Sequence, residues 1–191
     1  MAPVKTMVNV MRKQDLEIRM TIESILENSS SGQRLKNYFA DLPDKRIRRA
    51  ISVLSNVYPG KTTISDDDLS FILYMLSDIR FMKQDNFFEF VSAVNILSFT
   101  EYQKMLLIDS IKNNIEILCD KCTFELDTLL VSLFEPNELF QYLEVLAEKG
   151  GHHVLQTVSG ILRYNNFSNS RVSDEQIESL KQKISEFLNN K

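Results

Sequence analysis

Two short motifs contain every cysteine and every histidine of this chain. The first is Cys119-x-x-Cys122, and the second is the adjacent pair His152 and His153. Cysteine sulfur and histidine nitrogen are the usual ligands of structural zinc, which is held by a tetrahedron of such atoms. The four side chains therefore make a candidate Cys2His2 site that is divided between two segments of the chain.

The spacing within these motifs favours a structural role over metal binding. Adjacent histidines point about 100° apart on a helix, whereas familiar zinc modules separate their histidines by roughly three to five residues. Cys119 and Cys122, with Leu126, follow the spacing of a buried helical stripe, in which cysteine packs as a small hydrophobe. A thioredoxin-like redox pair would need a strand before its helix. We therefore predict buried cysteines with no metal and no cofactor, and zinc is the alternative.

The densest positive charge lies on a segment that Pro43 opens as a helix. Its basic residues are Lys45, Arg46, Arg48 and Arg49. The apolar residues of this segment form one stripe, which places Lys45, Arg48 and Arg49 on the outer surface. We predict that this face binds an acidic surface of another protein. Contact with nucleic-acid phosphates is the alternative, although no aromatic platform or glycine loop accompanies the basic run.

A phenylalanine-rich segment is the second candidate binding feature. Phe87 and Val91 follow helical spacing and are expected in the core. Phe88 and Phe90 cannot both share the face of Phe87. We therefore predict that at least one of the two is exposed, where an aromatic side chain would anchor a partner.

Three consecutive carboxylates, Asp66 to Asp68, invite a metal-binding interpretation because carboxylate oxygens bind hard cations. Successive helix positions fan out by about 100°, however, and do not converge on one ion. Acidic residues in a first helical turn also interact favourably with the helix dipole. We interpret this run as a helix start.

Catalytic motifs are scarce in this sequence. It contains neither a glycine-rich phosphate loop nor a Gly-x-Ser-x-Gly nucleophile motif. Its two histidines are adjacent and offer one place for an imidazole base. We predict a non-enzymatic protein, and a carboxylate pair assembled by the fold stays an open alternative.

The elements that carry these motifs are all expected to be helices. Five glycines and four prolines are few in 191 residues, and no segment alternates apolar and polar residues long enough to form a half-buried strand. A hydroxyl three positions before an acid or amide predicts a reciprocal helix cap. Such starts occur at Ser65, Thr100 and Ser173, and Pro136 after Glu135 marks another.

These four helix starts are separated by intervals of 35, 35 and 38 residues. Such spacing is typical of stacked helical hairpins. We predict an all-α fold of antiparallel hairpins in a short HEAT/TPR-like solenoid, and an irregular helical bundle is the alternative. Stacking in this register would bring Cys119 near His152 and His153. The candidate units are 65–99, 100–134, 135–172 and a capping helix at 173–189.

The N-terminal residues are predicted to form a separate segment. An apolar helical stripe runs through residues 14–27, and the sequence Asn-Ser-Ser-Ser-Gly at 28–32 then interrupts it. Such a stretch is a good hinge. We therefore expect a helical arm at 1–28 that is able to move, followed by one all-helical domain at 33–191.

Charge and composition further limit the classes of function that we expect for this protein. The net charge is −4, but residues 1–50 carry ten Lys and Arg against six Asp and Glu, whereas residues 51–191 carry twelve against twenty. No apolar run approaches the ~18 residues that span a bilayer, and two cysteines favour a reducing compartment. We expect a soluble, cytoplasmic protein with no membrane partner. The predicted function is a protein–protein interaction module of the adaptor, inhibitor or immunity-like type, and the alternative is a nucleic-acid-binding module.

Overall fold

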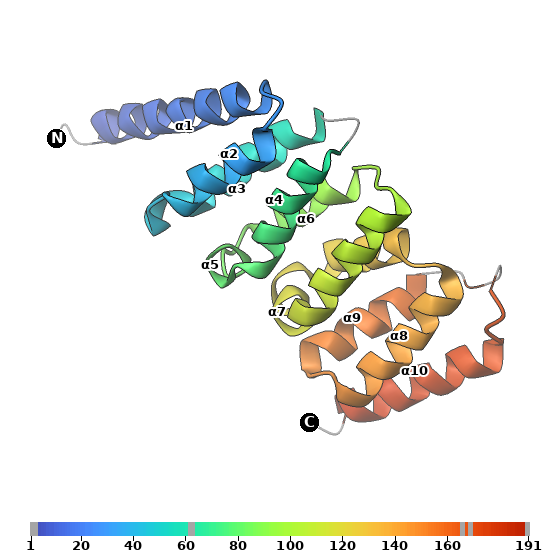
Figure 1. Cartoon of the computed structure of the whole chain (residues 1–191). Helices are drawn as coiled ribbons and strands as arrows, with labels where there is room; N and C mark the ends of the chain where they lie inside the picture. Colours follow the sequence, from blue (N-terminus) through green and yellow to red (C-terminus); the bar gives the residue numbers. More distant parts are fainter. Residues whose placement is uncertain (1–3, 61–63, 165–166, 168–169, 190–191) are drawn as a thin grey trace. The chain divides into compact units, whose positions relative to one another are not determined.

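The computed structural model describes residues 4–60, 64–164, 167 and 170–189, with side chains from Lys13 onward (Figure 1). Within these ranges the chain forms α-helices and one 3-10 turn, with no strand, which confirms the predicted all-α fold. No helix in the same ranges is long and apolar enough to cross a lipid bilayer. In chain order the elements are α1 (Val4–Leu26), α2 (Ser31–Ala40), α3 (Asp44–Val57), η1 (Tyr58–Gly60), α4 (Asp66–Ser77), α5 (Ile79–Met82), α6 (Phe87–Asn95), α7 (Glu101–Leu133), α8 (Pro136–Lys149), α9 (His152–Tyr164) and α10 (Asp174–Asn189).

The predicted helix caps are made by reciprocal hydrogen bonds. Ser65 Oγ accepts from Asp68 N at 3.1 Å, and the Asp68 carboxylate accepts from Ser65 N at 3.2 Å at the start of α4. These bonds satisfy amide groups that have no partner inside a helix. The corresponding pairs at the starts of α7 and α10 are Thr100 with Gln103 and Ser173 with Gln176.

The chain divides into two compact units, Met1–Gln103 and Lys104–Lys191. Helix α7 begins in the first unit and continues through the second. Its backbone leaves helical geometry at Asn114 (φ −124°, ψ 15°) and at Cys122 (φ −137°, ψ 33°). The sequence predicted two helices within 100–134, and these two interruptions divide α7 into helical segments before and after them.

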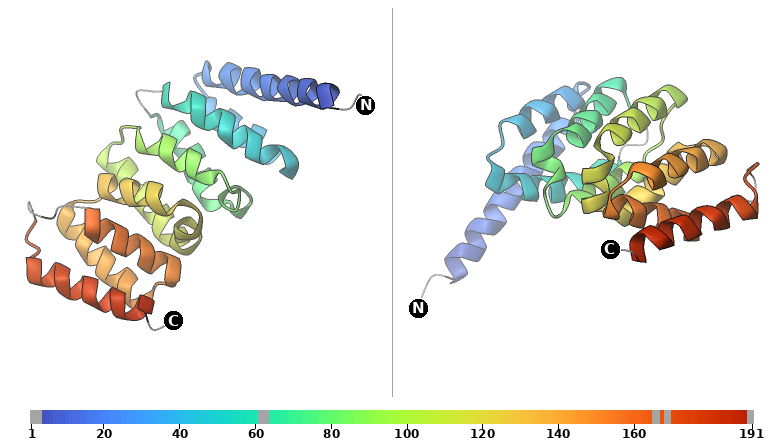
Figure 2. Two further views of the ribbon diagram at one scale, coloured as in Figure 1. Left: turned by 180° about the vertical axis from the view of Figure 1, so that it is seen from behind. Right: turned by 90° about the horizontal axis from the view of Figure 1, so that it is seen from below.

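Within the first unit, α4 packs against α2 and α6 packs against α3 (Figure 2). Ser30 precedes α2 and Ser65 precedes α4, so the predicted interval of 35 residues extends one hairpin earlier than the sequence indicated. Ser30 and Gln33 also fit the spacing of a reciprocal cap, but the Ser30 side chain makes no capping hydrogen bond. The amides at the start of α2 are satisfied instead by Asp67 of α4, which accepts from Gly32 N at 2.7 Å and Gln33 N at 2.9 Å.

An aromatic cluster forms the core of the first unit. Phe71 lies between Phe39 and Phe90, with ring centroids 5.6 Å and 6.3 Å away, and Phe87 lies 5.6 Å from Phe90. Phe90 is fully buried, which corrects its assignment to a binding surface. The physical reason is that positions 87 and 90 are one helical turn apart and share a face. Phe88 is 38% exposed.

Helix α1 is longer than predicted and begins at Val4. It packs against α3 and α2, and its Ile18 and Ile22 side chains are buried. The helix ends at Leu26, as the polar stretch at 28–32 predicted. In the described part of the chain, the N-terminal segment is therefore docked on its own unit.

Candidate functional site

The basic segment of α3 presents fewer free charges than the sequence indicated. Lys45 and Arg48 are exposed, whereas Arg46 and Arg49 are half-buried. Arg49 Nη1 donates to Gln14 Oε1 at 3.0 Å, and its Nε lies 3.4 Å from an Asp15 carboxylate oxygen. Arg49 therefore ties α1 to α3, and the expectation that it faces a partner is corrected.

The cysteines and histidines lie in different environments. Cys119 and Cys122 are fully buried, and burial raises the pKa of both thiols to about 12. His152 and His153 are exposed at the start of α9. His153 Nε2 lies 3.2 Å from Asp120 Oδ1. Asp120 follows Cys119 in the sequence, so the histidines lie near Cys119, as the predicted stacking of the helices required. Among the described residues, no group of three or more Cys, His, Asp or Glu side chains could hold a metal.

The three consecutive aspartates have structural roles, as their interpretation as a helix start predicted. Asp68 is buried in the cap of its own helix, and Asp67 caps α2. Asp66 Oδ1 accepts a hydrogen bond from Gln103 Nε2 at 3.3 Å. The run therefore joins the starts of three helices within the first unit.

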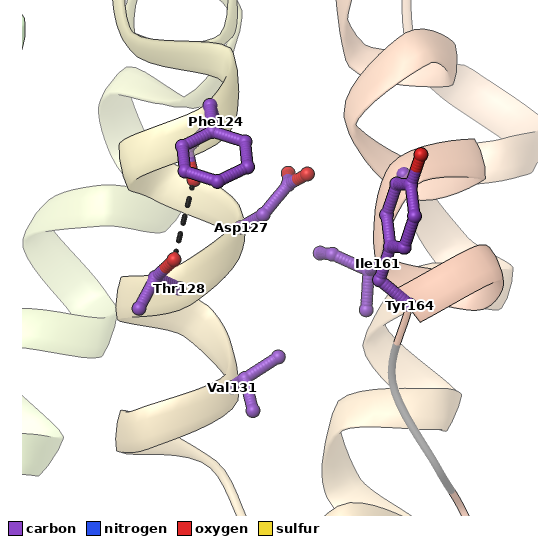
Figure 3. A pocket seen from close by; sticks show the side chains of 7 residues that line it. Phe124, Asp127, Thr128, Val131, Ile161 and Tyr164 are labelled. Carbon is purple, nitrogen blue, oxygen red and sulfur yellow. Dashed lines mark hydrogen bonds between the residues drawn. The ribbon is translucent and has the colours of Figure 1, made fainter.

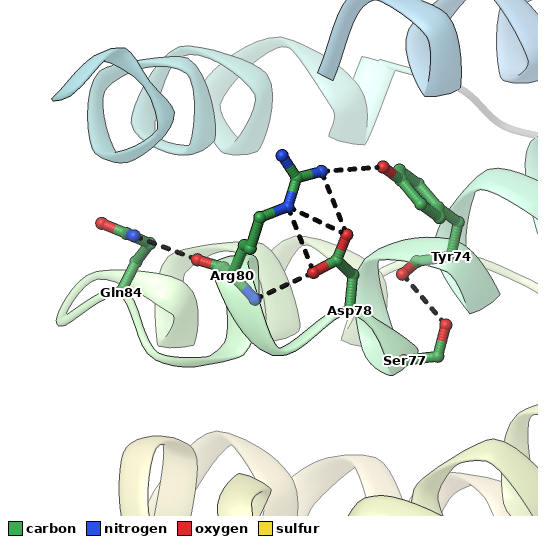
Figure 4. A network of polar contacts seen from close by, with 5 residues as sticks. All are labelled: Tyr74, Ser77, Asp78, Arg80 and Gln84. Atoms are coloured by element: carbon green, nitrogen blue, oxygen red, sulfur yellow. Dashed lines mark hydrogen bonds and ion pairs between the residues drawn. The ribbon is translucent and has the colours of Figure 1, made fainter. Parts of the chain in front are cut away.

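The side chains of a polar network at the junction of α4 and α5 also bond to one another (Figure 4). Asp78 Oδ1 accepts from Arg80 N at 2.9 Å and so caps α5, while Arg80 Nη2 lies 3.1 Å from Asp78 Oδ2. Arg80 Nη2 also donates to Tyr74 Oη at 3.3 Å. The hydrogen bond to Asp78 raises the pKa of the guanidinium. Arg80 is thus paired across the α4–α5 turn.

The strongest candidate site is an open pocket between the last part of α7 and α9 (Figure 3). Its volume is about 400 Å³. Two aromatic side chains, one carboxyl group and two aliphatic side chains dominate its wall. The lining residues are Phe124, Asp127, Thr128, Val131, Gly160, Ile161 and Tyr164.

Two exposed aromatic rings mark this pocket. Phe124 of α7 is 73% exposed and Tyr164 of α9 is 79% exposed. Figure 3 shows them on opposite helices, with Asp127 between them. Large apolar side chains that gather at a concave surface are typical of binding sites.

Asp127 gives the pocket its electrostatic character. Its carboxyl is half-buried, and Oδ1 is out of contact with solvent and has no hydrogen-bond partner within the described ranges. Burial, with a smaller effect from the negative charge of Glu125, raises the pKa of Asp127 from 3.8 to about 7. An unsatisfied buried oxygen is costly, so this carboxyl group gains from a donor that a ligand supplies.

Gly160 allows α9 to approach this carboxyl group. A Cβ atom at position 160 would lie 2.5 Å from Asp127 Oδ2, closer than real Cβ contacts. Thr128 Oγ1 donates to Phe124 O at 3.4 Å and so is engaged within its own helix. Asp127 is thus a polar group of the wall that lacks a full set of partners among the described residues.

Sequence reasoning missed this site, although part of its signal is present. Phe124, Asp127 and Val131 follow one helical face of α7, while Gly160 and Tyr164 lie one turn apart on α9. The apolar stripes that the sequence predicts follow the buried face of each helix. An exposed stripe that combines aromatic residues with a lone acid would have been the signal.

The chain matches no protein-family model, no curated protein and no solved structure.

Proposed function

We propose that this protein is a non-enzymatic binding module that holds a segment of a partner protein in the pocket between α7 and α9. The observation that carries the proposal is the exposure of Phe124 and Tyr164, at 73% and 79%, on either side of a half-buried carboxyl group. An adaptor or an inhibitor could both use such a site.

The energetics of aromatic burial support this proposal. Covering about 150 Å² of aromatic surface contributes roughly 3–4 kcal/mol. Binding hot spots are enriched in aromatic residues within concave, desolvated surfaces. The pocket volume of about 400 Å³ lies within the range of roughly 300–1,000 Å³ that is common for ligand sites. A few side chains of a partner segment would fill it.

The buried thiols favour binding over covalent chemistry. Thiolate is the nucleophilic form of cysteine, and burial holds the pKa of Cys119 and Cys122 at about 12. Both side chains are therefore protonated at neutral pH.

The basic face of α3 is a weaker candidate for a binding surface than the pocket is. An acidic partner or a nucleic acid would meet Lys45 and Arg48, while Arg49 is engaged with α1. Two phosphate contacts give a logarithmic salt slope of only about −2. We therefore favour the pocket over the nucleic-acid alternative.

Selection from a displayed library of random peptides against the full chain tests the proposal. We expect selected peptides to bind the Phe124→Ala/Tyr164→Ala variant at least about tenfold more weakly, a loss of about 1.4 kcal/mol. The matched control is Val145→Ala/Phe187→Ala, which removes apolar side chains of 47% and 50% exposure outside the pocket. The proposal is wrong if no peptides are selected or if they bind both variants equally.

A further inference from the structure

We propose that the pocket receives a basic side chain, lysine or arginine, whose cationic head lies between Phe124 and Tyr164 and against Asp127. This inference rests on the proposed function and names the chemistry of the partner segment.

The carboxyl group of Asp127 has an incomplete set of hydrogen bonds. Oδ1 has no donor within the described ranges, and Oδ2 faces the backbone of Gly160. The side chain also forms no salt bridge with a described basic residue. Asp127 lines the pocket and its side chain is only half-buried, so a ligand in the pocket reaches the carboxyl group. A charged donor makes a stronger bond to this group than a neutral donor does.

Two aromatic rings flank this carboxyl group. Phe124 and Tyr164 come from two different helices and stand on both sides of the Asp127 carboxyl (Figure 3). The face of an aromatic ring attracts a cation that lies within about 6 Å of its centre. A cation bound to Asp127 is therefore favoured by the rings as well as by the carboxylate.

Part of the pocket wall is aliphatic. Ile161 lies beside Tyr164, and Val131 lies below Asp127 in the view of Figure 3. Lysine and arginine bury their methylene stems along apolar surface while the charged head reaches a polar group. A purely apolar side chain would fill the same wall but leave the carboxyl group unsatisfied.

The same unit already contains a lysine held in this manner. Lys112 Nζ lies 5.5 Å from the centre of the Phe134 ring and 5.3 Å from that of Tyr142. These two rings are stacked with their centres 5.3 Å apart. Phe124 and Tyr164 provide two further rings, with a carboxyl group in addition and no lysine of the chain above them within the described residues.

Amide-resolved NMR titration of the full chain with single-residue probes tests the inference. The probes are N-acetyl-lysine-N-methylamide, its arginine analogue, and the uncharged norleucine analogue, which keeps the aliphatic stem. We expect the basic probes to shift the amides of Gly160 and Thr128 saturably, with Kd near the millimolar range of small fragments. Norleucine should bind at least about tenfold more weakly. Equal binding of norleucine would overturn the inference.

Asp127→Asn provides the residue test. This variant should lose about tenfold in affinity for the lysine probe, because the amide keeps the shape but not the charge. Asp120→Asn is the control, since it makes the same charge change on α7 outside the pocket. Unchanged lysine binding in Asp127→Asn, with a native spectrum, overturns the inference. Selected peptides that need Phe124 but no basic residue would leave the binding module standing and this inference refuted.

Discussion

At the scale of single residues, the protonation of Asp127 in the pocket affects the free energy of unfolding. Its pKa is about 7 in the folded protein and 3.8 ordinarily, so the folded state binds its proton more tightly than the unfolded state does. The contribution of this group to the free energy of unfolding therefore falls as pH rises from about 4 to 7 and stays low above that range. The charged neighbour Glu125 acts in the same direction, and α9 presents the uncharged Gly160 and Ile161.

Asp127→Asn should remove this pH dependence. The variant keeps the size of the side chain but has no charge to desolvate. We expect the variant to be more stable than the wild type near pH 8 and of similar stability near pH 4. Urea unfolding of both proteins at the two pH values measures the difference. A difference that does not change with pH would show that the carboxyl group is solvated in the folded state.

The same residue marks the limit of sequence reasoning. The position of Asp127 on a helix was readable, but its environment depends on Gly160, which lies on another helix. Neither residue is unusual in its own segment. Contact between distant helices creates the raised pKa, so no local pattern could report it.

At the scale of elements, the helices were predictable because their signals are local. Ser65 and Asp68 form their cap within one turn, and Pro136 begins α8 where proline is tolerated. The positions at which α7 leaves helical geometry, Asn114 and Cys122, are harder to predict, since no glycine or proline marks them. Asn114 Nδ2 donates to Ser110 O at 3.0 Å, an alternative to regular helix bonding that asparagine offers in many contexts.

Substitution of Gly32 tests how closely α2 packs against α4. A Cβ at this position would lie 2.0 Å from the main-chain oxygen of Asp67, which cannot move without its helix. We expect Gly32→Ala to lower the free energy of unfolding by about 2 kcal/mol, because the helices must separate and the capping bonds from Asp67 weaken. Denaturant unfolding followed by circular dichroism provides the measurement.

Gly60→Ala is the matched control for this variant. Among the described residues, no atom lies within 4 Å of a Cβ added at Gly60, and neither glycine has a positive φ. Both substitutions reduce the freedom of the unfolded chain equally, so Gly60→Ala should be neutral or slightly stabilising. Equal effects of the two variants would contradict the close packing of α2 on α4.

At the scale of the whole molecule, most described polar links between helices join residues separated by about one hairpin. Asp67 to Gly32, Asn86 to Arg48 and Glu116 to Gly151 are separated by 35, 38 and 35 residues. Contacts of this kind couple each helix to its neighbours in the chain. Where polar links join mainly neighbouring helices, stability is approximately a sum of local and nearest-neighbour contributions.

The effect of Gly32→Ala should therefore weaken along the chain. We expect native-state hydrogen exchange to show the largest loss of amide protection in α2 and α4, a smaller loss in α6, and little change in α9 and α10, because local openings have their own free energies. Amide-resolved exchange of the wild type and the variant under the same conditions makes the comparison. An equal loss of protection from α2 to α10 would instead mean that both units open in one cooperative transition. In that case the pocket between α7 and α9 would be as sensitive to changes in α2 as to changes in its own walls.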